Sequence, residues 1–356
     1  MLFCLPLEPM EERYTEQWYR WFKEDCNKLD VPCMYIDGEQ LSSVVEVGTV
    51  LDAAGTNYWK ATQLARVCKL FKDRNVQDGD VFFTMDMWHP GLEMIPYMAT
   101  LYGLDVRIYA FLHAGSYTTE DFAAPMWLWA MHFEAGWHYM CDKVFVGSQY
   151  HKDKFDKLRL HSGGDPSIVV TGNPIRLNEM PELNAGLREN IIIFTHRWDV
   201  EKRPNHFVEV MSRLWQERKD FKVIITTSRP TFRSNNEELL HVLDDVLFPY
   251  EVKVGLSKQN YYNELNKAKI FVSTTIEENF GYCLVEAMAM GVTPVVAAGY
   301  SHSEIVGNAH QWLYWSECVA MCSEYLDNPV LPQALVSDVA RFEDSFVHMI
   351  EAMYNE

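Results

Sequence analysis

The chain of 356 residues is long enough for two domains, each with its own core. Hydrophobic residues make up 48% and charged residues 23%, which excludes a disordered chain or a fibrous repeat. The formal net charge of -19 is spread over both halves of the chain, so neither half is a basic nucleic-acid-binding module.

The chain begins with the apolar run 2–7, which is preceded by no basic residue and is followed by several glutamates. This pattern is typical of a first β-strand and not of a signal peptide. The apolar stretches fall short of the roughly 18 residues that a membrane-spanning helix needs. The eight cysteines form no CxxC pair and no zinc-ligand pattern, which indicates reduced thiols. We therefore expect a cytoplasmic protein without a membrane-inserted segment.

Strand-like and helix-like segments alternate along the first half, as in layered α/β proteins. Apolar β-branched runs predict strands, and apolar residues at helical spacing predict helices. The predicted strands are residues 2–7, 81–85, 106–112 and 143–147, and the predicted helices are residues 15–27, 58–71 and 126–140. A further strand runs into Gly172 and Pro174, and we place a domain boundary there.

The second half repeats this alternation. Short β-branched runs without alternating polarity predict parallel strands buried on both faces, at residues 191–195, 222–227, 269–274 and 293–298. A helix is predicted around 208–215, with Pro204 near its start, where helices tolerate proline. One last helix with an apolar stripe over 339–353 needs a surface to pack on. The predicted domains are residues 1–175 and 176–338, and residues 339–356 form a helix that returns to the first domain.

The most informative segment, residues 269–291, has the pattern of a strand, an acidic loop, a helix and a C-terminal glycine. Gly281 lets the main chain approach a ligand closely, and the N–H groups of the helix that begins there favour an anion such as phosphate. Glu278 and Glu286 flank this helix start, and carboxylates accept hydrogen bonds from sugar hydroxyls. Alternatively, both glutamates are ordinary partners of the helix dipole.

A second block, residues 191–204, places Arg197 and Lys202 directly after a buried strand. Ligands of open α/β sheets bind outside the carboxyl ends of the strands, so two cations there suit a diphosphate. The alternative is ion pairing of these cations with Asp199 and Glu201 on the surface.

These two blocks resemble the retaining GT-B glycosyltransferases, close to glycosyltransferase family 4. The family's Glu-x7-Glu motif is matched by Glu278 and Glu286, and its Arg and Lys pair by Arg197 and Lys202. Residues 294–306 are similar to the next strand and donor loop of the family, with Glu304 at its acidic position. The resemblance implies an α/β protein of the GT-B fold, with two Rossmann-like domains facing across a cleft and a C-terminal helix that crosses back to the first domain.

The resemblance also implies roles for these residues. Glu286 would bind the ribose and Glu278 the sugar of a UDP- or GDP-sugar donor. The departing diphosphate would be neutralised by Arg197 and Lys202, which requires no metal ion or prosthetic group. The other implied donor-binding residues are Asn279, Phe280, Gly281, Tyr282 and Glu304, and the candidate catalytic residues are Glu278, Arg197, Lys202 and His113.

The acceptor side is expected in the first domain. His113 follows the strand 106–112 and is similar to the family's histidine that faces the donor sugar, although a structural histidine is the alternative. Asp86 follows the strand 81–85 and either orients an acceptor hydroxyl or caps a turn. Many family members have a glycine-rich loop after the first strand, which this chain lacks, so Tyr14 and Thr15 are candidates to replace it. Ser116, in the loop after His113, is a further acceptor-side candidate.

The acceptor itself is suggested by a second resemblance. Residues 13–18, 55–60 and 113–117 are similar to glycosyltransferases of bacteriophages, whose common acceptor is a hydroxymethylated DNA base. Residues 196–198, followed by Lys202, are similar to glycosyltransferases that modify a tRNA base. The first hypothesis is therefore a retaining glycosyltransferase that modifies phage DNA in the host cytoplasm. The alternatives are a tRNA base or a saccharide as acceptor, a GT-B nucleotide-sugar epimerase, and a non-catalytic nucleotide-sugar sensor.

Overall fold

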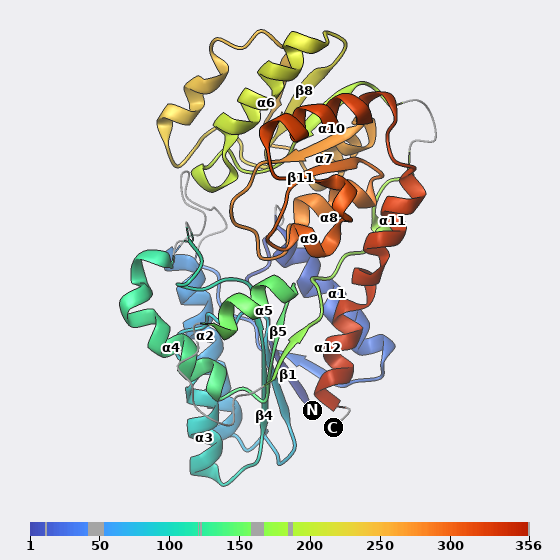
Figure 1. The fold of residues 1–356 in the computed structure, drawn as a ribbon. Coiled ribbons are helices and arrows are strands. Elements are labelled where there is room, and N and C mark those ends of the chain that lie inside the picture. The colour runs from blue at the N-terminus through green and yellow to red at the C-terminus, as the bar shows by residue number, and fades with distance from the viewer. Residues whose placement is uncertain are drawn as a thin grey trace. The chain divides into compact units, whose positions relative to one another are not determined.

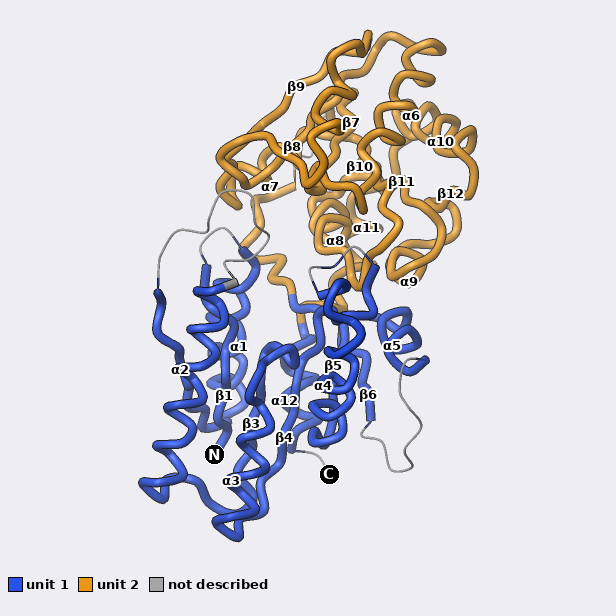
Figure 2. Tube along the Cα trace, turned by 90° about the vertical axis from the view of Figure 1, so that its left-hand side faces the viewer, with its two compact units in different colours: residues 1–174, 344–356 blue, residues 175–343 orange. Residues whose placement is uncertain are grey.

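The computed structural model describes residues 1–10, 13–41, 53–119, 121, 123–157, 167–183 and 188–354. The chain divides into two compact units, which Figure 2 shows in different colours: unit 1 comprises Met1–Pro174 and Asp344–Glu356, and unit 2 comprises Ile175–Glu343. Each unit is a parallel sheet covered by helices (Figure 1). The expected fold class, two Rossmann-like α/β units with a C-terminal helix that belongs to the first, is confirmed.

Unit 1 is built on a six-stranded parallel sheet. In spatial order its strands are β2 (Cys33–Tyr35), β1 (Leu2–Leu5), β3 (Val81–Thr84), β4 (Arg107–Leu112), β5 (Lys143–Val146) and β6 (Ser167–Val170). The helices between them are α1 (Tyr14–Lys28), α2 (Ala53–Lys72), α3 (Met94–Tyr102), α4 (Trp127–Tyr139) and α5 (Gln149–Asp156). The edge strand β2 was not predicted from the sequence.

Both faces of this sheet are buried, because neighbouring residues of a strand point to opposite faces. In β3 the ring of Phe82 stacks on Phe3, at 5.0 Å between centroids, and lies 6.0 Å from Phe71 of α2. The next residue, Phe83, instead contacts Phe22 of α1 at 5.0 Å. Helices therefore cover both faces, which explains the continuous apolar strand sequences.

Unit 2 contains a second six-stranded parallel sheet. In spatial order its strands are β12 (Gln311–Trp312), β11 (Thr293–Ala297), β10 (Ile270–Ser273), β7 (Ile191–Phe194), β8 (Lys222–Thr226) and β9 (Tyr250–Lys253). Its helices are α6 (Pro204–Glu217), α7 (Lys258–Lys267), α8 (Tyr282–Ala289), α9 (His302–Ile305), α10 (Trp315–Asp327) and α11 (Pro332–Ala340). The edge strands β9 and β12 were not predicted.

The strand β7 shows how the two faces of this sheet are covered. Ile191 and Ile193 belong to an apolar cluster with residues of α8 and α11. Ile192 and Phe194 belong to a second cluster, with residues of α6 and α10. Every residue of β7 is thus inaccessible to solvent.

The C-terminal segment differs from its prediction. In place of one helix over 339–353, α11 ends at Ala340, a 3-10 turn covers Arg341–Asp344, and α12 (Ser345–Tyr354) follows. The apolar stripe serves two different cores: Phe342 packs on Phe280 of unit 2, whereas Phe346 packs on Trp18 and Phe22 of unit 1. The 3-10 turn therefore connects α11, which packs in the core of unit 2, to α12, which packs in the core of unit 1.

The carbonyl groups at the end of α12 are bound by side chains of the unit 1 sheet. Arg107 donates from Nη1 to the carbonyl oxygen of Met353 at 2.9 Å, and Lys143 donates from Nζ to that of Ala352 at 3.0 Å. Cations at a helix C-terminus satisfy its carbonyls and offset its dipole. In the parts of the chain that the structure describes, no helix is both long and apolar enough to cross a bilayer.

The strand order reverses between β1 and β3 in unit 1 and between β7 and β10 in unit 2. Chain connections leave such a switch point in opposite directions, so a crevice opens outside the carboxyl ends of the two strands. The loops that follow these four strands are therefore the expected location of a ligand site in each unit.

Phe346→Ala tests the role of α12. The variant is expected to lower the free energy of unfolding by about 3 to 5 kcal/mol, because it removes a fully buried ring from the unit 1 core. The measurement is urea denaturation. Phe133→Ala, which removes a ring that is 50% exposed, is the matched control and should cost under about 1 kcal/mol. Equal costs for the two variants would contradict the packing of α12 on unit 1.

Candidate active site

An ion pair joins the two loops at the switch point of unit 2. Lys202 follows β7 at the end of a 3-10 turn, and Glu278 follows β10. The two side chains meet with 2.9 Å between Nζ and Oε2, and they are only 11% and 20% exposed. Nζ of Lys202 also donates to Oγ1 of Thr275 at 3.4 Å and to the carbonyl oxygen of Glu277 at 3.3 Å. One ammonium group therefore organises the loop before α8.

The electrostatics of the pair keep Glu278 ionised. Burial opposes the charged carboxylate, but Lys202 and, more weakly, His302 and His196 favour it, and the pKa of Glu278 falls to about 2. At neutral pH its oxygens are therefore hydrogen-bond acceptors only. Such a carboxylate suits a ligand that presents hydroxyl groups.

Gly281 begins α8 in a conformation that favours glycine. Its φ is +89° and its ψ is 61°, in the left-handed region. A Cβ at this position would lie 3.2 Å from Cγ of Glu278 and 3.3 Å from Nε2 of His302. Glycine at this position thus allows α8 to begin directly beside the ion pair. The N–H groups and the dipole at this helix start favour an anion.

Arg197 lies in the same loop as Lys202 but has different partners. Its guanidinium donates to Oε1 of Glu201 at 2.7 Å and lies 3.4 Å from Oδ2 of Asp199, and its side chain remains 39% exposed. Ion pairing with Asp199 and Glu201, the alternative interpretation from the sequence, therefore describes Arg197 in this structure. It does not describe Lys202, which pairs with Glu278 across the switch point.

Glu286 forms a second cluster with residues that the sequence did not suggest. It is 5% exposed, forms an ion pair with Lys258 of α7, and accepts a hydrogen bond from Tyr262 at 3.2 Å. Glu286 therefore faces α7 and is more than a partner of the helix dipole. No periodic pattern connects residues 258, 262 and 286, so only the fold brings them together.

The other predicted donor-side residues lie around α8 and α9. Phe280 packs in the unit 2 core against Phe342, so its side chain is structural and any donor contact would come from its main chain. Asn279 and Tyr282 flank Phe280 and Gly281, and both are partly buried. Glu304 is exposed on α9, two residues after His302.

Two buried histidines beside the ion pair were not among the site residues predicted from the sequence. His196 bonds through Nε2 to Oγ of Ser273 at 2.8 Å. His302 is fully buried, and burial lowers its pKa to about 4, so it is neutral at pH 7. A neutral ring next to Lys202 adds no positive charge to the site, which leaves Lys202 as the counterion of Glu278.

In unit 1, residues from the two loops after β3 and β4 meet residues from the start of α1. Nε2 of His113 lies 2.8 Å from the carbonyl oxygen of Met85. Because a carbonyl oxygen can only accept a hydrogen bond, Nε2 carries the proton. Nδ1 of His113 lies 3.5 Å from the hydroxyl oxygen of Tyr14. Burial lowers the pKa of His113, so the ring is neutral at pH 7. Thr15 is buried and accepts a hydrogen bond from the main chain of Met10 at 3.2 Å.

Asp86 is held by Lys60, a residue that the sequence did not suggest. Nζ of Lys60 lies 2.7 Å from Oδ2 of Asp86, and the N–H of Trp88 donates to Oδ1 at 3.0 Å. Burial opposes ionisation, but Lys60 and His113 outweigh it, and the pKa of Asp86 lies below its usual value. The hydrogen bond from the main chain of Trp88 matches the turn-capping interpretation. The Asp86 carboxylate also lies close enough to His113 for the two groups to interact electrostatically.

Ser116 is fixed by a buried carboxylate, Glu134 of α4. The main-chain N–H and the hydroxyl of Ser116 donate to Glu134 at 2.6 and 2.7 Å, and the indole of Trp88 donates to it at 2.5 Å. Glu134 therefore ties the loop after β3 to the loop after β4. Within the described ranges, no group of three or more His, Cys, Asp or Glu side chains is arranged to hold a metal ion.

Comparison with protein families bears mainly on unit 2. Residues 176–328 match the model of the family described as "Glycosyl transferases group 1". This range contains Arg197, Lys202, Glu278 and Glu286. A curated relative, the tRNA-queuosine alpha-mannosyltransferase of Drosophila melanogaster, is 30% identical over 115 residues, which cover 32% of this chain and 30% of that protein. The match thus spans less than a third of the relative's length.

Solved structures are similar over a larger part of the chain. The lipopolysaccharide outer core galactosyltransferase WaaB has a TM-score of 0.70 at 11% identity, covering 100% of this chain and 99% of its own. Sucrose-phosphate synthase from Thermosynechococcus elongatus has a TM-score of 0.68 at 12% identity, with coverages of 99% and 96%. The pneumococcal O-GlcNAc transferase GtfA, solved with UDP and GlcNAc, has a TM-score of 0.56 at 14% identity, with coverages of 84% and 60%. At these identities the likeness shows the fold, which is GT-B.

Lys202→Met tests the ion pair through its pH dependence. The folded-state pKa of Glu278, about 2, lies below its usual 4.5, so its ionisation stabilises the fold above pH 4.5 and this contribution is lost as pH falls towards 2. The variant should therefore be less stable by roughly 3 kcal/mol at pH 7, with a deficit that narrows below pH 4.5. Urea denaturation from pH 7 to pH 3 measures this, with exposed Lys72→Met as control. A deficit that does not change with pH would be the contrary result.

Gly281→Ala tests the crowding at the start of α8. Gly103→Ala is the matched control, because Gly103 also has a positive φ, +67°, but nothing lies within 4 Å of its Cβ position. The control isolates the backbone cost of about 1 to 2 kcal/mol. Gly281→Ala should cost more than this, since the new Cβ also presses on Glu278 and His302. Thermal and urea unfolding compare the two, and equal losses would show that the site tolerates a side chain there.

Proposed function

We propose that this protein is a retaining glycosyltransferase that moves a sugar from a UDP- or GDP-sugar to an acceptor hydroxyl. The observation that carries the proposal is the Lys202–Glu278 ion pair, which lies at the switch point of unit 2 next to the glycine that begins α8. The spacing of Glu278 and Glu286, together with the family match over 176–328, supports the retaining class.

In this proposal unit 2 binds the donor. The diphosphate lies between Lys202, the exposed guanidinium of Arg197 and the first turn of α8. Breaking the glycosidic bond places negative charge on the leaving phosphate, and fixed cations with a helix N-terminus stabilise that charge without reorganising. Because two side-chain cations are already in place, we propose a metal-independent reaction.

The two glutamates hold different parts of the donor. Glu278, kept ionised at neutral pH, accepts hydrogen bonds from the sugar hydroxyls. Glu286, steadied by Lys258 and Tyr262, accepts hydrogen bonds from the ribose. The donor loop with Glu304 completes the site. Lys202 contacts both the carboxylate that binds the sugar and the phosphate that leaves, so it couples binding to the departure of the leaving group.

Unit 1 supplies the acceptor side. Neutral His113 lies between the carbonyl of Met85 and the hydroxyl of Tyr14, with Asp86 close enough to affect its pKa. This arrangement orients polar groups at the carboxyl ends of β3 and β4 and keeps positive charge on Lys60 instead of the imidazole. We propose that His113 contacts the sugar and that Asp86 orients the acceptor.

The acceptor that we propose is a hydroxyl group on a nucleic-acid base. A hydroxymethylated DNA base follows from the similarity to bacteriophage enzymes, and a modified tRNA base is the second candidate. The similarity to the Drosophila melanogaster tRNA-queuosine alpha-mannosyltransferase favours the tRNA base. All eight cysteines are free thiols, which supports the proposed location in a reducing cytoplasm.

Arg197→Ala is expected to weaken the binding of UDP and GDP by about 1.5 to 3 kcal/mol, the range for hydrogen bonds to charged groups. Isothermal titration calorimetry measures this. Arg213→Ala is the matched control, because Arg213 pairs with Glu209 over the same four-residue spacing as Arg197 with Glu201 but lies on the exposed face of α6. Unchanged nucleotide binding by both variants would rule out the proposed diphosphate site.

The activity itself is tested with the same two variants. The wild-type protein is incubated with a panel of UDP- and GDP-sugars and with duplex DNA containing hydroxymethylated bases, with tRNA, or with no acceptor. We expect a sugar-sized mass increase on one nucleic acid, lost in the Arg197→Ala variant and kept in the Arg213→Ala variant. Conversion of the donor to its epimer without an acceptor would instead establish an epimerase. The absence of any product with every donor would reject the transferase.

A further inference from the structure

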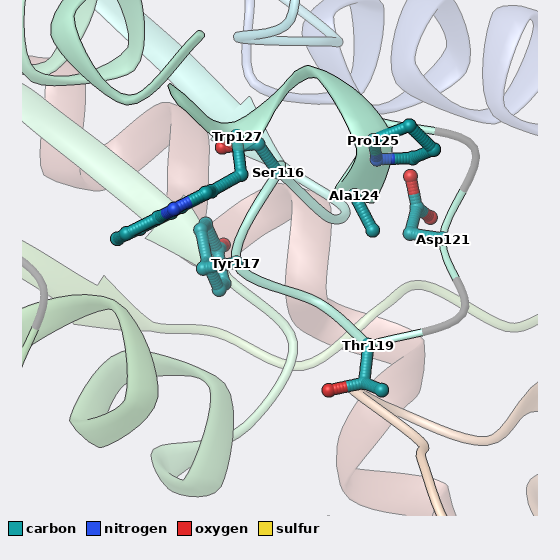
Figure 3. A pocket seen from close by; sticks show the side chains of 7 residues that line it. All are labelled: Ser116, Tyr117, Thr119, Asp121, Ala124, Pro125 and Trp127. Carbon is teal, nitrogen blue, oxygen red and sulfur yellow. The ribbon is translucent and has the colours of Figure 1, made fainter. Parts of the chain in front are cut away.

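A pocket of about 550 Å³ opens in unit 1 along the loop that leads from β4 to α4 (Figure 3). It is lined by Ser116, Tyr117, Thr119, Asp121, Ala124, Pro125 and Trp127. Figure 3 shows the indole of Trp127 beside Ser116 and Tyr117, across the pocket from Asp121. The volume falls within the range of small-molecule sites, about 300 to 1,000 Å³. All of these described lining residues belong to unit 1.

The chemistry of this lining differs from that of the donor site. Among its described lining residues the charged group is the carboxylate of Asp121, which repels a phosphate. Ser116 and Thr119 add hydroxyl groups, and Trp127 adds an indole that is 37% exposed. A planar, neutral or cationic ring with hydrogen-bond donors at its edge fits this set, whereas a nucleotide diphosphate does not.

Trp127 is the aromatic side chain in the lining that is best placed to stack on a ring. The hydroxyl of Tyr117 bonds to Nε2 of His151 at 2.6 Å, and the ammonium of Lys154 lies 5.8 Å from the centre of its ring. Tyr117 is therefore held by α5. The indole of Trp127, at the start of α4, is exposed enough to receive a base, and stacking on an aromatic side chain is tolerant of base identity.

The wall of the pocket is fixed before any ligand arrives. Glu134 accepts hydrogen bonds from both the main chain and the hydroxyl of Ser116, which is 4% exposed. A Cβ on Gly115 would lie 2.7 Å from the same carboxylate and 2.4 Å from the ring of Tyr117, so the loop packs tightly here. A preformed wall lowers the conformational entropy that the protein loses when a ligand binds.

We propose that this pocket binds the hydroxyl-bearing base of the acceptor, stacked on Trp127 with its polar edge towards Ser116, Thr119 and Asp121. The inference rests on the proposed glycosyltransferase function, and it adds the place and chemical class of the acceptor. The pocket loop begins at His113, three residues before Ser116, so the base is held on the same loop as the residue proposed to contact the sugar.

Trp127→Ala tests the pocket by direct binding of nucleosides. The probes are queuosine and 5-hydroxymethyl-2′-deoxycytidine, titrated by calorimetry with saturating UDP present so that the donor side is filled. At least one probe should bind the wild-type protein, and Trp127→Ala should weaken it roughly tenfold or more, the effect of losing one base–aromatic stack. Trp129→Ala, two residues further on the same helix, 51% exposed and outside the lining, is the matched control and should bind like the wild type.

Asp121→Asn tests the charge of the pocket separately. Asp121 accepts a hydrogen bond from the main chain of Ala123 at 3.0 Å, and asparagine keeps that turn. With UDP present, 5-hydroxymethyl-2′-deoxycytidine monophosphate should bind the wild type more weakly than its nucleoside does, and the variant should reduce this difference. A difference that the variant leaves unchanged would show that Asp121 does not select against phosphate.

The outcomes separate this inference from the proposed function. If no probe binds, or if Trp127→Ala and Trp129→Ala bind alike, the pocket is not the base site, while the effect of Arg197→Ala on UDP still decides the donor site. In transfer assays Trp127→Ala should raise the KM for the nucleic acid and leave the Kd for UDP unchanged. Separate reactions with tRNA and with hydroxymethylated duplex DNA then identify which nucleic acid carries the base.

Discussion

The ion pair between Lys202 and Glu278 is the interaction on which the candidate active site depends. A carboxylate buried to this extent would be protonated or would destabilise the fold without a counterion, and Lys202 supplies that counterion at 2.9 Å. The same ammonium group fixes the loop of Thr275 and Glu277, and Gly281 keeps the approach to α8 open beside it. A single contact between two strand ends thus assembles a cation and an ionised carboxylate, the groups that the proposed function assigns to the leaving phosphate and to the sugar.

Unit 1 repeats this arrangement with different residues. Its own switch point lies between β1 and β3, and the buried pair of Lys60 with Asp86 lies just beyond β3, with 2.7 Å between the charged atoms. In both units a lysine keeps a buried carboxylate ionised at the carboxyl edge of a parallel sheet. The likeness to GT-B structures concerns the fold, and these pairs show what the fold provides: two crevices of similar construction whose loops carry different chemistry.

The interior strands of each sheet could be predicted from the sequence, whereas three of the four edge strands could not. The fourth edge strand, β6, was predicted from the apolar run that leads into Gly172 and Pro174. The eight strands inside the two sheets are runs of apolar and β-branched residues, because helices cover both faces of a parallel sheet and every position must be buried. The edge strands β2, β9 and β12 are short and partly exposed, so they lack this signal. The structure has two helices where the sequence predicted one at the C-terminus. The spacing of apolar residues indicates that they are buried, but it does not indicate in which core.

The sequence by itself determined where the strands end and which charged residues follow them, and hence that Arg197, Lys202, Glu278 and Glu286 lie along one edge of a sheet. Only the tertiary structure decided their partners: Lys202 with Glu278, Arg197 with Glu201, and Glu286 with Lys258. It also revealed His302 beside the pair and Glu134 behind Ser116. The physical reason is the separation along the chain between the residues that interact. Local patterns reflect the period of a helix or strand, whereas a contact between residues 76 positions apart depends on how the strands are ordered in the sheet.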